Sequence, residues 1–329
     1  MRVLSPLSRP GSATALFAAA ILAGSLLGAL APTAGSTVGS FADPLIVLLV
    51  GILFFTLRLD GLSALRRAPR LVALAIGINF LVIPLIAWPL TALLPSDALR
   101  LGVLLYLLAP CTDWFLGFTR MAGGDTTVGA ALIPVQMTLQ LLLYPVWLSI
   151  FTGQSAALVF DSATATLLTW FALPAGIALA VRLLTRFALP VGARSALYSA
   201  ADRAVPFLIA AVIFALFAGN VETIVSDIGS FAWVLLVVFV FFMITFGIGE
   251  AASALWRLSH RERALLTMTT SARNAPLMLA LTTVALPDQP VVAAAIVLGM
   301  LIEFPHLTAL THVMRRRLAR RASAPMLSG

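Results

Sequence analysis

Four charged side chains lie inside stretches of sequence that are otherwise apolar: Asp113, Glu250, Arg273 and Glu303. A charge at the centre of a membrane-spanning helix costs about 2.5–3.5 kcal/mol on insertion scales, so such residues usually face the interior of a helix bundle and mark a partner or a pathway. These four residues are therefore the first candidates for a functional site.

Asp113 and Arg273 each lie beside a proline that interrupts an apolar run. Asp113 ends the Pro-Cys-Thr-Asp of residues 110–113, and Arg273 lies within the Ser-Ala-Arg-Asn-Ala-Pro of residues 271–276. Paired broken helices are the best sequence indication of a binding site near the membrane midplane. If the two breaks cross, Asp113 and Arg273 could form an ion pair, either a fixed structural pair or one that opens during transport.

Glu303 and His306 are three residues apart, which places them on one face of a helix. A carboxyl group in a low-dielectric environment favours its protonated form and can then bind and release a proton. This predicts proton coupling at Glu303, with Asp113 as a second candidate; a hydrogen-bonded group that only fixes helix packing is the alternative. His306 would relay a proton or cap a polar patch. One Glu-x-x-His without a second set does not make a metal site, so we expect no metal.

Cys111 is the only cysteine, which excludes an internal disulfide. A buried cysteine usually behaves as a small apolar residue. Here it adjoins a helix break, and the N-terminus of a half-helix beginning there would favour the thiolate. Because a thiolate is a soft ligand that selects thiophilic solutes, we expect Cys111, Thr112 and the amide of Asn274 to contact the solute.

Three further amide side chains, those of Asn79, Gln136 and Gln140, lie in apolar stretches. Most amides within membranes bridge helices. Gln136 and Gln140 share one helical face, and all three are candidates for lining a cavity. Glu250 lies towards the cytoplasmic end of its span, two turns before Arg257, so we expect it to snorkel or to pair locally and to have a structural role.

The composition of the chain requires lipid as its solvent. Hydrophobic residues make up 61% of the 329 residues and charged residues only 10%, against roughly a quarter in soluble proteins. The net charge of +8 does not indicate nucleic acid, because the arginines flank apolar runs. Windows of about 20 apolar residues predict ten spans. They lie near residues 13–30, 43–58, 71–94, 99–120, 126–152, 163–186, 203–219, 229–256, 263–286 and 290–314. The connections are short, so residues 1–329 are expected to form one membrane domain.

The arginines predict the orientation of these spans. With the N-terminus inside, all of the 21 basic residues except Arg100 and Arg273 fall in cytoplasmic loops or tails. This predicts a multi-pass protein of the bacterial inner (plasma) membrane with both termini in the cytoplasm. Residues 29–31 resemble a signal-peptidase site, but loss of the first span would leave the mature N-terminus outside, so we expect retention.

Five spans per half, residues 1–155 and 156–329, would insert the halves in opposite orientations, which is the arithmetic of an inverted repeat. The expected breaks fall in the fourth and ninth spans, which are equivalent places in the two halves. The predicted fold is an all-α membrane protein with ten transmembrane helices in a 5+5 inverted repeat. Such an architecture is typical of small-solute transporters.

Several motifs resemble one known family. Leu-Ala-Pro-Cys-Thr-Asp-Trp at 108–114 and Met-Ala-Gly-Gly-Asp at 121–125 resemble the fourth span of the arsenite efflux permeases, in the bile acid/sodium symporter superfamily. Ser-Ala-Arg-Asn at 271–274 and Leu-Ile-Glu-Phe-Pro at 301–305 resemble its ninth and tenth spans. The resemblance implies broken helices 4 and 9 that cross. It also implies a panel domain of spans 1, 2, 6 and 7 that moves against a core of the other six.

The resemblance also implies an activity. In the arsenite branch a cysteine in the fourth span and a late glutamate are the functional residues, and they map onto Cys111 and Glu303. The chain would then be a secondary transporter, not an enzyme, that exports trivalent arsenite by proton antiport without a cofactor. Antimonite would be a second cargo of the same chemistry. Uptake of an organic anion gripped by Arg273 is the alternative, and a membrane enzyme or sensor is the third, for which we find no phosphate loop or His/Cys cluster.

The chain departs from that superfamily at two places. Sodium-coupled members carry a Ser-Asn pair after the fourth-span break and Glu-x-x-x-Gln-Asn in the ninth span, where this chain has Phe115, Leu116, Thr269 and Arg273. Sodium needs oxygen ligands and an arginine would repel it, so sodium coupling is not expected. Asp113 also stands where many arsenite permeases carry a small apolar residue.

Overall fold

The computed structural model describes residues 10–56, 62–110, 115–152, 172–225 and 228–323. Within these ranges the regular structure is helical, apart from one isolated β-bridge. In chain order the helices are α1 (Pro10–Leu30), α2 (Pro32–Gly39), α3 (Ala42–Thr56), the 3-10 helix η2 (Leu62–Arg67), α4 (Pro69–Gly77), the π-helix η3 (Ile78–Val82), α5 (Ile83–Thr91), α6 (Asp97–Leu108), α7 (Phe115–Met121), α8 (Thr126–Thr152), α10 (Leu173–Ala188), α11 (Val191–Val225), α12 (Ile228–Leu255), α13 (His260–Ser271), α14 (Ala275–Ala285) and α15 (Pro290–Ser323).

Six helical stretches in the described part of the chain are long and apolar enough to cross a membrane. They are Pro32–Thr56, Pro69–Thr91, Thr126–Trp147, Val191–Glu222, Gly229–Leu255 and Pro290–Ala319. Two of the remaining expected spans are each divided by a break, into α6 and α7 and into α13 and α14. α1 (21 residues) contains the apolar stretch Ala15–Leu30, and the first part of the expected span 163–186 lies outside the described residues. The protein is therefore multi-pass, while the ten-span inverted repeat stays a prediction.

Two helices extend well beyond the expected spans. α11 begins at Val191, so the connection that carries Arg194 and Arg203 is helical, although a loop was expected. α15 runs to Ser323 and carries the last arginine cluster on a helix instead of a tail. A hydropathy window detects only the part of a helix that lies in lipid, and alanine and arginine continue a helix readily in water.

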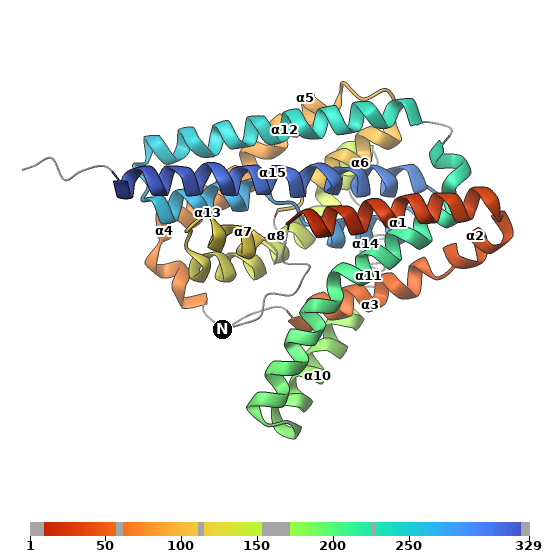
Figure 1. Ribbon diagram of the computed structural model, residues 1–329, viewed down its shortest axis with the longest axis horizontal. Helices are drawn as coiled ribbons and strands as arrows, with labels where there is room; N and C mark the ends of the chain where they lie inside the picture. Colours follow the sequence, from red (N-terminus) through yellow and green to blue (C-terminus); the bar gives the residue numbers. More distant parts are fainter. Residues whose placement is uncertain (1–9, 57–61, 111–114, 153–171, 226–227, 324–329) are drawn as a thin grey trace, which may run out of the picture.

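α12, α15 and α1 run side by side, while α10 and the first part of α11 project from the rest of the molecule (Figure 1). α1 and α2 pack closely on α11 through glycines. A Cβ atom at Gly24 would lie 2.5 Å from the Phe214 carbonyl oxygen, and one at Gly35 would lie 2.6 Å from that of Ala218. Backbone oxygens cannot move aside, so only glycine permits this approach of the helices.

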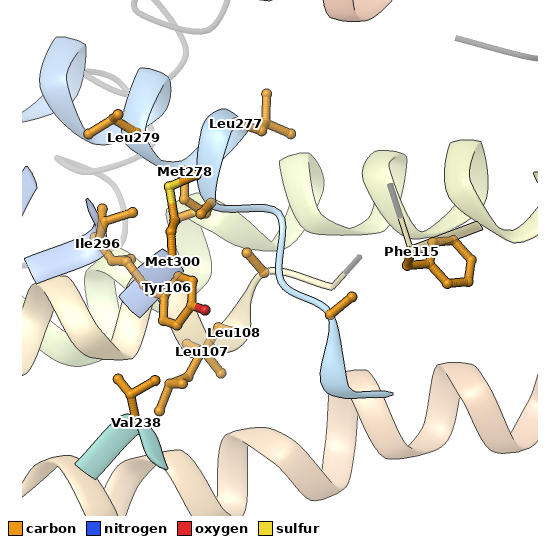
Figure 2. Close-up of a cluster of buried hydrophobic side chains, with 14 of the residues drawn as sticks. Tyr106, Leu107, Leu108, Phe115, Val238, Leu277, Met278, Leu279, Ile296 and Met300 are labelled. Carbon is orange, nitrogen blue, oxygen red and sulfur yellow. The ribbon is translucent and has the colours of Figure 1, made fainter. Parts of the chain in front are cut away.

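The two interrupted helices meet at their breaks. Pro110, after α6, forms an antiparallel bridge with Arg273, after α13, and the Asn274 backbone N–H donates to the Ala109 carbonyl at 3.0 Å. The breaks lie where the prolines predicted them. Apolar side chains from α6, α14, α15 and α12 surround this region (Figure 2): Leu107 and Leu108, Met278, Ile296 and Met300, and Val238. Arg273 and Asn274, at the second break, are therefore buried.

Candidate functional site

Arg273 lies at the second break and is completely buried. Its Nη1 donates to the Leu107 carbonyl at 2.9 Å, and its Nη2 donates to Asn79 Oδ1 at 3.0 Å and to the Thr270 carbonyl. Leu107 and Thr270 belong to the last turns of α6 and α13, where carbonyl groups have no partner within the helix. The guanidinium therefore caps two helix C-termini at once, and the negative ends of both helix dipoles stabilise its charge.

An aromatic ring completes the surroundings of this arginine. The Arg273 Cζ lies 5.7 Å from the centroid of the Phe241 ring of α12, the geometry of a cation–π contact. A buried charge is tolerated only when it is paired or fully hydrogen-bonded. Three oxygen acceptors at Nη1 and Nη2, together with the ring face, stabilise the guanidinium in this position.

Asn79 reaches Arg273 from the π-helix η3. Its Nδ2 donates to the Ala75 carbonyl at 3.0 Å and to the Thr269 carbonyl at 3.3 Å, and its Oδ1 accepts from the guanidinium. π-helical turns are rare and are frequent at functional sites. Asn79 is completely buried and holds the arginine, and its role in lining a cavity stays a prediction.

Glu303, on α15, is completely buried beside the second break. Its Oε1 accepts from the Arg273 backbone N–H at 3.1 Å, and its Oε2 accepts from the Tyr106 hydroxyl at 2.9 Å. The same hydroxyl lies 3.1 Å from the Gly299 carbonyl. A hydroxyl has one proton and also accepts. When Glu303 is ionised, Tyr106 can donate to it; when Glu303 is protonated, Glu303 can donate to Tyr106 and Tyr106 to Gly299. Both protonation states can thus be hydrogen-bonded without movement.

The amides of α8 are divided between two situations. The amide nitrogen and the amide oxygen of Gln136 each lie 3.3 Å from the Thr269 hydroxyl oxygen. Gln136 therefore belongs to the same polar group. Gln140, one turn further along, is buried, and its amide has no hydrogen-bond partner in the described part of the chain. Only Gln136 is therefore linked to the breaks by hydrogen bonds.

The other predicted residues are placed as follows. Asn274 caps α14, its Oδ1 accepting from the Leu277 N–H at 3.3 Å. His306 is buried and stacks on Phe242 with ring centroids 4.7 Å apart. Cys111, Thr112 and Asp113 lie outside the described residues, directly after Pro110, so their roles and an Asp113–Arg273 pair stay predictions.

Glu250 pairs with arginines of two other helices. Glu250 accepts from Arg263 Nε at 3.0 Å and also pairs with Arg317 of α15. Arg257 follows the end of α12 and has a positive φ of 51°, which turns the chain towards α13. These two ion pairs join α12, α13 and α15 at one end of the bundle. Among the described residues, no three His, Cys, Asp or Glu side chains lie close enough together to hold a metal ion.

Sequence reasoning missed Tyr106 and Thr269 as members of this polar group. Tyr106 gave only a weak signal, as a hydroxyl-bearing aromatic residue in the apolar run of α6, and Thr269 was noted only as a departure from the sodium-coupled members. Threonine hydroxyls commonly satisfy themselves on their own helix, so the type of residue does not reveal its partner.

Membrane-length apolar helices, two interrupted helices that meet, and buried charges at the meeting point together define a polytopic membrane transport protein. The sequence model of the Sodium Bile acid symporter family matches residues 44–245, more than half of the chain, and the chain belongs to this family. It is thus a secondary transporter of a small solute and not an enzyme. The match covers Asn79 and Tyr106 and ends before Arg273 and Glu303. No curated protein sequence matches the chain significantly.

Proposed function

We propose that this transporter exports trivalent arsenite from the cytoplasm in exchange for protons. The observation that carries the proposal is Glu303, a completely buried carboxyl group hydrogen-bonded to the backbone of one broken helix and to Tyr106 on the other. Such a group can bind and release a proton while its hydrogen bonds are rearranged and not lost. Protonation at Glu303 would bias the contact between the two breaks, which is what coupling to transport requires.

The metalloid would bind at the first break. Arsenous acid is neutral at physiological pH and thiophilic, and Cys111 supplies the soft sulfur ligand. Thr112 and Asn274 would contact its hydroxyl groups, and Asp113 would be a second proton carrier. The backbone pairing of Pro110 with Arg273 supports this arrangement, because Pro110, which directly precedes Cys111, lies at the second break.

We further propose the architecture in which this takes place. Ten spans in a 5+5 inverted repeat, with repeats near residues 1–155 and 156–329, would place both termini in the cytoplasm of a bacterial inner membrane. Spans 1, 2, 6 and 7 would form the panel that moves against a core holding both breaks. The close contact between the glycines of α1 and the backbone of α11 supports a panel that moves as one unit. The two helices cannot slide past each other without backbone collisions.

An organic anion is the alternative cargo, with Arg273 as the group that grips it. Of the arginines that the structure describes, Arg273 is the one that is completely buried. However, its Nη1 and Nη2 already donate to protein oxygens, so an anion would have to displace them. This favours the metalloid proposal.

Arsenite efflux from cells and uptake into everted vesicles, with and without a pH gradient, test the proposal. We expect Cys111→Ser to abolish arsenite protection and Glu303→Gln to abolish the response to the gradient. Glu250→Gln, which removes a carboxylate at the end of the bundle, serves as the matched control and should transport normally. Equal protection by the Cys111→Ser variant, or uptake of a bile acid that depends on Arg273 but not on Cys111, would contradict the proposal.

A further inference from the structure

In the described part of the chain, three oxygen atoms accept hydrogen bonds from the guanidinium of Arg273. They are the carbonyl oxygens of Leu107 and Thr270 and the side-chain oxygen of Asn79. The two carbonyls end the half-helices α6 and α13, each of which carries about half a negative charge at its C-terminus. In transporters with broken helices, such exposed carbonyls and half-helix C-termini are the groups that coordinate a coupling cation.

The oxygen set also has the chemistry of a cation site. Neutral carbonyl and amide oxygens are the ligands that hard cations prefer in proteins. The opposite interpretation, a site in which Arg273 binds an external anion, would place that anion beside the negative ends of two helices. The Phe241 ring on α12 adds a second group that attracts positive charge. All the described contacts of the guanidinium therefore select a cation at this position.

We propose that the oxygen atoms of Asn79, Leu107 and Thr270 form a monovalent-cation site that this chain occupies with its own guanidinium group. A tethered cation is present at every stage of transport and is never released. External sodium then has neither the space nor the electrostatic attraction to enter, and the transporter works without it. Removing the side chain should empty the site and make it available to free guanidinium ion and, more weakly, to sodium. The inference does not depend on which solute is transported.

Binding of the ion to the purified, full-length protein tests this directly. We would measure thermal unfolding in detergent for the wild type, Arg273→Ala and Arg273→Met, with low-millimolar guanidinium chloride, sodium chloride or choline chloride at constant ionic strength. We expect guanidinium to raise the unfolding temperature of Arg273→Ala saturably, and choline not to do so. The wild type should not respond, nor should Arg273→Met, because the apolar side chain fills the same space without a charge.

Two controls separate the site from general effects of salt. Arg100→Ala makes the same chemical change at a partly exposed arginine that lies over Trp88, and should show no stabilisation specific to guanidinium. Adding Asn79→Ala to Arg273→Ala removes one of the three oxygens and should raise the half-saturating guanidinium concentration roughly tenfold, about 1.4 kcal/mol.

A folded, monodisperse Arg273→Ala protein that responds to neither ion would overturn the proposal. If that variant does not fold, the wild type decides. If sodium, but not choline, changes the unfolding temperature or the transport rate of the wild type saturably, the guanidinium has not replaced an external cation and the proposal is wrong. If the wild type responds to sodium no more than to choline, the proposal is supported. Because unfolding is measured without solute, a failure of the arsenite proposal would leave these results unchanged.

Discussion

Gly299 permits the contact between Tyr106 and Glu303, and replacing it by alanine is a sharp test of the site. A Cβ atom at Gly299 would lie 2.5 Å from Tyr106 Cε1, 2.6 Å from Cδ1 and 2.8 Å from Cζ. The Tyr106 ring is completely buried and its hydroxyl is hydrogen-bonded to Glu303, so moving the ring costs free energy. Overpacking costs about 1–3 kcal/mol, and losing a hydrogen bond to a buried carboxyl costs about 1.5–3 kcal/mol. We therefore expect Gly299→Ala to lose about 2.5–6 kcal/mol of stability.

Reversible unfolding in detergent, followed by the intrinsic fluorescence of the protein, measures this loss. The matched control is Gly51→Ala in the interior of α3, where an added Cβ meets nothing within 4 Å. That substitution should be neutral or stabilise by up to about 1 kcal/mol, since alanine is the better helix former.

A double-mutant cycle shows whether the ring is the cause. Tyr106→Leu removes the ring that the new methyl group would meet, so the double variant should be less destabilised than the sum of the single variants. We expect a coupling free energy of about 1–3 kcal/mol. If Gly299→Ala unfolds like the Gly51 control, or if the two losses simply add, the close approach of α15 to Tyr106 is wrong.

Three further predictions follow from contacts described above. Glu303→Gln should fold like the wild type, since an amide can keep both hydrogen bonds, while transport in vesicles no longer responds to a pH gradient; a normal response would remove Glu303 from the coupling step. Gly28→Ala should lower the free energy of unfolding by about 1–3 kcal/mol because its Cβ would collide with the Ala218 carbonyl oxygen. An unfolding temperature equal to that of the wild type would refute the close contact of α1 with α11. Glu250→Gln should lose at most about 1 kcal/mol, because its arginine partners are partly exposed, and high salt should remove the difference from wild type.

The sequence alone was sufficient for the all-helical, multi-pass architecture and for both helix breaks. Hydrophobicity determines where lipid surrounds the chain, and a proline beside polar residues indicates where a helix must end. It also singled out Asn79, Arg273 and Glu303 as costly residues in apolar surroundings. It could not show that these three lie in one group, because contacts between spans far apart in sequence depend on how the helices pack.

The errors have similar physical causes. Glu250 was compared only with Arg257, its neighbour in sequence, whereas the arginines that neutralise it come from α13 and α15. The ends of α11 and α15 were placed at the limit of the apolar run, although a helix can continue into water. Gly299 had no distinguishing signal in the sequence, since its importance comes from a ring on α6.

The π-helix at Ile78–Val82 has a consequence for engineering and for aligning this chain with others. A π turn is one α-helical turn with an extra residue inserted. Deleting one residue within this turn would restore the regular helix and leave the two halves in nearly the same orientation, because the π turn has already absorbed the extra residue. The same deletion in α4 or α5 would instead rotate one half by about 100° relative to the other. A one-residue gap in an alignment of this span therefore belongs within the π turn, where the residues on either side stay matched.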